Sequence, residues 1–111
     1  MESILTSIKL LLGIKEEYEY FDDQIIMHIN SVFFILTQLG VGPSEGFSIE
    51  DKFATWNEFL PDEQNLEAVK SYVHLKVKLL FDPPMSTAVT ESINRLISEL
   101  EFRLNAAAEI N

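Results

Sequence analysis

The spacing of apolar residues predicts a helix at the start of the chain. Between residues 4 and 12, isoleucines and leucines recur at intervals of three and four, which is the period of one face of an α-helix. Gly13 follows this pattern, and glycine readily adopts the left-handed conformation that ends many helices. We therefore predict a short amphipathic helix that ends at Gly13.

A longer apolar pattern predicts a second helix over residues 22–39. Asp22 is placed to cap its first amides, Asp23 to complement the helix dipole, and Phe21 to pack against Ile26. Gly40 is the predicted end. Apolar side chains occur on more than one face, which is typical of a helix that is central or contacts a partner. The main stripe is Ile25, Ile26, Ile29, Val32, Phe33, Leu36 and Leu39, and Met27, Phe34 and Ile35 lie outside it.

Residues 40–46 contain three glycines, a proline and a serine, a composition typical of a loop. Farther on, Thr55 and Glu58 have the spacing of a capping box, and Pro61 prevents a long continuation. We predict a single helical turn there that displays aromatic residues. Residues 46–49 could form a short extended piece, but no segment alternates with period two for long enough to predict a strand.

Two further helices are predicted in the second half. One runs from residue 62 to the corner at Asp82-Pro83-Pro84, where two prolines end it. Ser86 is placed to cap the other, which extends over some 20 residues, about 30 Å, before fraying from about residue 106. Its stripe is Val89, Ile93, Leu96, Ile97, Leu100, Leu104 and Ala107, supported by pairs from Glu91 to Arg95 and from Glu99 to Arg103. The predicted fold is all-α: residues 1–111 form one bundle of four main helices plus a short turn, with a long loop between the second and third main helices.

Charge and composition narrow the functional classes. Eighteen acidic residues against eight basic ones give a net charge of -10, which repels nucleic-acid phosphates, so we do not expect sequence-specific nucleic-acid binding. Residues 1–62 carry -8 of this charge. The chain has no cysteine, which excludes disulfides and fits a reducing compartment. It has no signal-peptide pattern, and its longest apolar run is too short and too polar to span a membrane.

No residue pattern supports catalysis, a cofactor or a metal. His28 and His74 lie on different predicted helices and lack the spacing of zinc ligands. The acidic cluster at residues 16–23 lacks the loop glycine of an EF-hand. Gly40-Val41-Gly42 follows a helix and lacks the remaining residues of a nucleotide-binding loop, and the helical serines have no nucleophile elbow. We therefore predict no catalytic, cofactor-binding or metal-binding residue.

Large aromatic residues outside the main helices are more informative about function than the candidate catalytic or metal-binding residues. Such side chains either fold back onto the core or meet another chain. The same two alternatives apply to Phe102, because it lies off the main apolar stripe of the last predicted helix. The candidate interface residues are Phe47, Phe53, Trp56, Phe59, Arg95, Glu99, Phe102 and Arg103.

The segment from Tyr72 to Pro84, YVHLKVKLLFDPP, followed by ESINRLISELEFRLN from Glu91 to Asn105, resembles the head-tail connector proteins of tailed bacteriophages and prophages. The resemblance extends over residues 4–105 and rests on packing motifs. It implies a helical subunit that assembles into a ring below the portal of a filled capsid, with a tail or stopper protein as the next component. It also implies that DNA passes through the ring, that residues 96–110 meet the portal or neighbouring subunits, and that residues 40–53 face the channel or the next component.

Further expectations follow from this resemblance. The protein would act at the head-tail junction of the virion, after a stage in the host cytoplasm, with itself and the portal as partners. Acidic walls would let a duplex slide. The alternative is an acidic helical regulator that mimics DNA or occupies a basic groove on a nucleic-acid-binding protein, which the charge of residues 1–62 would suit. An enzyme is the third and least supported class.

Overall fold

The computed structural model describes residues 2–62 and 64–110. Within them the chain forms α1 (Ile4–Leu11), α2 (Asp22–Gln38), α3 (Trp56–Phe59), α4 (Leu66–Phe81) and α5 (Thr87–Ile110). No strand occurs in these two stretches, and one isolated antiparallel bridge joins Ser3 to Thr55. The predicted all-α bundle with four main helices, one short turn and a long loop after the second helix is therefore confirmed.

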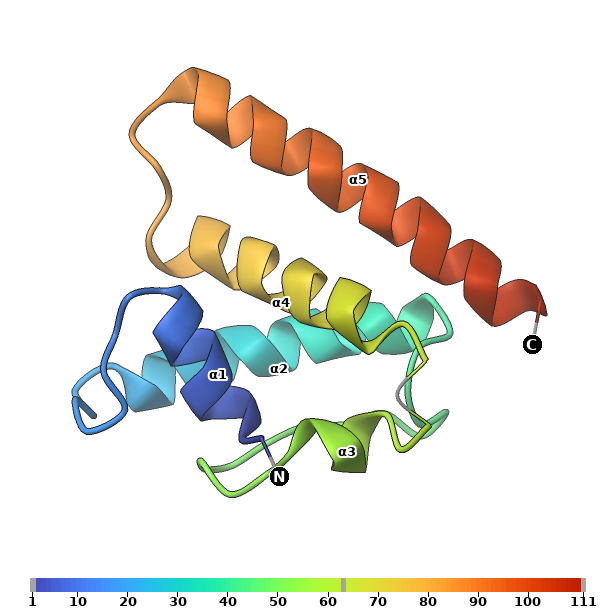
Figure 1. Ribbon diagram of the computed structural model, residues 1–111, viewed down its shortest axis with the longest axis horizontal. Coiled ribbons are helices and arrows are strands. Elements are labelled where there is room, and N and C mark those ends of the chain that lie inside the picture. The colour runs from blue at the N-terminus through green and yellow to red at the C-terminus, as the bar shows by residue number, and fades with distance from the viewer. Residues whose placement is uncertain (1, 63, 111) are drawn as a thin grey trace.

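Helix α4 is the centre of the arrangement. It packs against α2 on one side and α5 on another, while α1 packs against both α2 and α4. Figure 1 shows α4 lying between α2 and α5, with α3 at the edge distant from α5. The molecule is flat, with principal extents of 39 × 35 × 19 Å. Consequently α5 has a single extensive packing partner and one uncovered long side.

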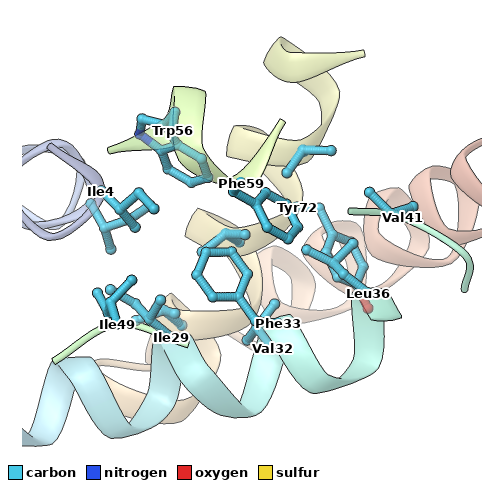
Figure 2. Close-up of a cluster of buried hydrophobic side chains, with 14 of the residues drawn as sticks. Ile4, Ile29, Val32, Phe33, Leu36, Val41, Ile49, Trp56, Phe59 and Tyr72 are labelled. Atoms are coloured by element: carbon cyan, nitrogen blue, oxygen red, sulfur yellow. The ribbon is translucent and has the colours of Figure 1, made fainter. Parts of the chain in front are cut away.

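The core forms where α1, α2, α3 and α4 meet. Phe33 of α2 stacks on Phe59 at 4.5 Å between ring centroids and meets Trp56 edge-on at 6.3 Å. Figure 2 shows these rings together between α2 and the α3 segment, with aliphatic side chains around them. The indole nitrogen of Trp56 donates to the hydroxyl of Ser7 at 2.8 Å. That bond satisfies the polar atom of a buried ring, as burial requires.

Most predicted helix ends are confirmed. Ser86 caps the start of α5 by accepting from the Val89 amide at 3.3 Å. At α3 the Thr55 side chain accepts from the Glu58 amide while Glu58 accepts from the Thr55 amide, completing the capping box. Gly40 follows α2 with a φ of +87°, which suits the left-handed residue that ends a helix.

Three boundary predictions were wrong. Asp22 does not cap α2: Phe21 holds the N-cap position without a side-chain bond, and the Asp22 carboxylate pairs instead with Lys9 at 2.8 Å. Helix α4 begins at Leu66, after Asn65 adopts a left-handed φ of 63°, later than predicted. Helix α5 continues to Ile110 without a break at residue 106, because Ala108 lies so close to Gly40 that a Cβ there would be 3.0 Å from its own.

Candidate assembly surfaces

The predicted loop aromatics divide between core and surface. Trp56 and Phe59, two of the candidate interface residues, are buried and pack on Phe33 of α2. Phe47 is half-buried, with its ring 5.2 Å from that of Phe59. Phe53 alone of the four stands out, with 75% of its surface exposed.

A polar clamp holds the long loop against α2. The Asn30 side-chain amide donates to the Ile49 carbonyl at 2.9 Å, and its oxygen accepts from the Ile49 amide at 2.8 Å. Both backbone groups of a buried loop residue are thereby satisfied. This anchor carries the chain from the Gly-rich segment into α3, and it leaves Phe53 at the tip of the turn that follows.

The outer side of α5 exposes apolar side chains to solvent. Phe102 is 75% exposed, and Leu96 and Val89 are about half-exposed. Only part of the predicted stripe is therefore buried, because α5 has 24 residues and packs chiefly on the 16-residue α4. Within residues 87–109 of α5, the buried residues are Ile97 and Leu104.

Two polar contacts fix the rotation of α5 about its axis. The Tyr72 hydroxyl of α4 donates to the Glu101 carboxylate at 2.6 Å, and the Asn105 amide donates to the Leu39 carbonyl at 3.1 Å. Burial raises the pKa of Tyr72 above its ordinary value, and the bond to negatively charged Glu101 raises the same pKa further. With Glu101 held inward, the adjacent Phe102 is turned to solvent.

Charged side chains flank Phe102 on the same outer side. Arg103 pairs with Glu99 at 2.8 Å, as the i,i+4 spacing predicts. The matching pair from Glu91 to Arg95 does not form: Arg95 donates to the Ser92 hydroxyl at 3.2 Å. A hydroxyl three residues away competes with the more distant carboxylate for the same guanidinium. The predicted pair of Glu99 with Arg103 is therefore confirmed, and the predicted pair of Glu91 with Arg95 is wrong.

A groove of about 360 Å³ lies between α1 and α4, and sequence analysis did not identify it. Leu10 and Leu11 of α1 line it and are 62% and 53% exposed. Lys70 and His74 of α4 line the other side. The sequence contained a signal for it, because Leu10 is apolar but lies outside the predicted stripe of the first helix, which is Ile4, Leu5, Ile8, Leu11 and Leu12.

The two histidines lie on different helices, His28 on α2 and His74 on α4. His28 lies on α2 against the Phe81 ring, with centroids 6.5 Å apart. Burial lowers the pKa of His74, the positive Lys78 lowers it further, and a backbone hydrogen bond to Leu11 acts in the opposite sense. Across residues 2–62 and 64–110, no group of three or more histidines, aspartates and glutamates has the geometry to hold a metal ion. Nor is any helix in those ranges long and apolar enough to cross a membrane.

Acidic residues gather at a second groove, also of about 360 Å³, between the start of α2 and the loop before α3. Its lining includes Glu19, Asp22, Asp23, Glu50 and Asp51, with Phe53 at its edge. Five of the eleven acidic residues in the range 1–62 therefore line this side of the molecule, together with Lys52. That side is unsuited to nucleic-acid phosphates and suited to cationic groups.

Comparison with known proteins agrees with a structural component. Neither the curated proteins nor the solved structures contain a significant match to this chain. The sequence profile described as phage connector protein matches residues 4–111. A match of that extent covers every helix described above, so the chain belongs to the phage connector protein family and is a structural phage component.

Proposed function

We propose that this protein is a ring-forming adaptor between the portal and the tail, through which the phage DNA passes. The observation that carries the proposal is the uncovered face of α5 in a chain of the connector family. A long helix that buries only part of its apolar stripe, and exposes Phe102, retains surface for another protein. The partners under this proposal are further copies of the chain, the portal protein and a downstream tail or stopper protein.

Electrostatics support the conduit role. A net charge of -10 disfavours persistent contact with phosphates, so DNA can slide past an acidic wall without being held. The protein would act at the head-tail junction of the virion and would reside in the host cytoplasm until assembly. No catalytic step, cofactor or metal is required for this role.

The decisive experiment mixes the purified protein with the portal ring of the same phage. Negative-stain imaging and analytical ultracentrifugation should show a closed ring of this chain on the portal. A monomer in free solution is compatible with the proposal, because closure can require the portal as template. Failure to bind the portal at high concentration, with no ring in any condition, would contradict it.

A second candidate function, an acidic regulator, is favoured by the acidic groove beside Phe53. Such a protein would occupy a basic surface on a nuclease, polymerase subunit or repressor, as a DNA mimic does. A pull-down from infected host cells separates the two candidates. Recovery of portal and tail proteins supports the adaptor, whereas recovery of a nucleic-acid-binding enzyme without virion components supports the regulator.

A further inference from the structure

We infer that Phe102 of one copy inserts into the α1/α4 groove of the next copy, so that neighbouring subunits meet head to tail. This inference rests on the proposed function and specifies the contact from which the ring would be built. The protruding element is the face of α5 around Phe102 and Leu96. The receiving element is the groove lined by Leu10, Leu11, Lys70 and His74.

The two surfaces lie on opposite sides of the α4–α5 pair. An α-helix turns about 100° per residue, so Lys70 and His74, each two positions from Tyr72, point about 160° away from the side that faces α5. By the same geometry Phe102, two positions before the buried Leu104, points about 160° away from α4. In Figure 1 the groove side of α4 adjoins α1, and the outer side of α5 forms the opposite edge.

Because the groove and the Phe102 face lie on opposite sides of one copy, their placement determines the symmetry of the contact between copies. A copy can offer its groove to one neighbour and its Phe102 face to another at the same time. Such a contact joins two different patches, which is the heterologous arrangement that generates closed rings when the rotation closes. An isologous dimer would instead place the same patch of both copies face to face.

Charge favours a contact of α5 with the α1/α4 groove over a contact between the α5 helices of two copies. Helix α5 has four glutamates and two arginines, a formal charge of -2. Helix α4 has three lysines and one glutamate, +2. The lining of the α1/α4 groove includes Glu2, Glu67 and Lys70, a formal charge of -1, whereas five carboxylates and Lys52 give the groove beside Phe53 a charge of -4. A second acidic copy therefore meets less repulsion at the α1/α4 groove than at the groove beside Phe53.

The groove suits an aromatic side chain. Its volume is about 360 Å³, and two half-exposed leucines supply apolar surface beside polar lining residues that include Lys70, which is paired with Glu2 and Glu67. The Phe102 ring is flanked by the ion pair of Glu99 and Arg103. An aromatic anchor in an apolar pocket with charged residues around it is the usual composition of an interface hot spot.

Cysteine cross-linking tests the contact directly, because the natural chain has no cysteine. Phe102→Cys and Leu11→Cys are prepared as separate proteins, mixed in equal amounts on the portal ring, and oxidised with diamide. We expect a disulfide-linked dimer in the mixture and none in either protein alone. The double variant should give a ladder of linked oligomers.

Phe53→Cys is the matched control, because Phe53 is as exposed as Phe102, at 75%. Mixed with Leu11→Cys, it should not cross-link above background. In a second measurement, Phe102→Ala should raise the concentration at half-assembly by roughly tenfold or more, while Phe53→Ala leaves it unchanged. Circular dichroism should confirm that each variant retains its helices.

Two results would overturn the inference. A Phe102→Cys protein that cross-links with itself would indicate an isologous α5 contact. A mixture that cross-links no more than the Phe53→Cys control, on rings visible by negative stain, would place the contact elsewhere and leave the adaptor role intact. Absence of both rings and cross-links would contradict the inference and the proposed function together.

Discussion

Lys9 is the polar residue whose removal should most destabilise the fold. It lies on α1 with only 2% of its side chain exposed. Its ammonium donates to the Glu16 carbonyl at 2.9 Å and to the Tyr18 carbonyl at 2.8 Å, and it pairs with the Asp22 carboxylate at 2.8 Å. The ammonium thus makes two hydrogen bonds to backbone carbonyls and one ion pair. One side chain thus joins α1, the following turn and the start of α2.

Lys9→Met keeps the length of the side chain and removes its charge and donors. Breaking a buried ion pair costs about 3–5 kcal/mol, and the low end applies here because Asp22 retains 20% exposure and is partly rehydrated. We therefore expect a loss of about 3 kcal/mol in the free energy of unfolding. For a domain of this size, that is a fall in melting temperature of about 12–20 °C.

Urea denaturation followed by circular dichroism measures this change, with Lys15→Met as the control. Lys15 is an exposed lysine in the same segment, and its replacement should change stability by no more than about 0.5 kcal/mol. Equal stability of Lys9→Met and Lys15→Met would refute the reasoning, because it would show that the three contacts are offset by the desolvation of the ammonium.

Two further predictions concern the loop and the last helix. Gly42 has a φ of +84°, and a Cβ there would lie 2.4 Å from the Phe59 ring, so Gly42→Ala should cost about 2 kcal/mol or more by chemical denaturation. Gly46→Ala, with φ +96° and open space, should cost about half as much; equal losses would contradict the steric argument. The raised pKa of Tyr72 predicts that stability falls as pH rises above about 10, where the unfolded-state tyrosine ionises first, by up to about 1.4 kcal/mol per pH unit. Tyr72→Phe should lose the bond to Glu101 but show a smaller fall in stability at alkaline pH. Parallel curves of unfolding free energy against pH for this variant and the natural protein would count against the argument.

Features predicted correctly from the sequence are those set by neighbouring residues. The capping box of Thr55 and Glu58, the pair of Glu99 with Arg103 and the stop at Gly40 each depend on residues within four positions. Local geometry determines such contacts whatever the rest of the chain does. The helices were predicted correctly because the spacing of their apolar residues is regular over several turns.

Features that were missed depend on distant partners. Asp22 looks like a helix cap by position, yet a lysine 13 positions earlier takes its carboxylate. Asn30 interrupts an apolar run with no local reason, and its partner is the backbone of Ile49. Which loop aromatic is buried depends likewise on packing around Phe33 of α2. Phe102 was recognisable because a large ring beside glutamate and arginine lies off any apolar stripe.

The contacts that fix α5 would also make the proposed assembly of this acidic chain selective. Tyr72 and Asn105 set the rotation of the helix through Glu101 and Leu39, and this rotation keeps Phe102 directed outward. The acidic groove near Phe53 repels a second acidic copy from that side. Repulsion over much of the surface, combined with one exposed aromatic face on α5 and one less acidic groove between α1 and α4, leaves few orientations in which two copies can meet. The same negative charge that would let DNA pass would therefore also restrict how the subunits join.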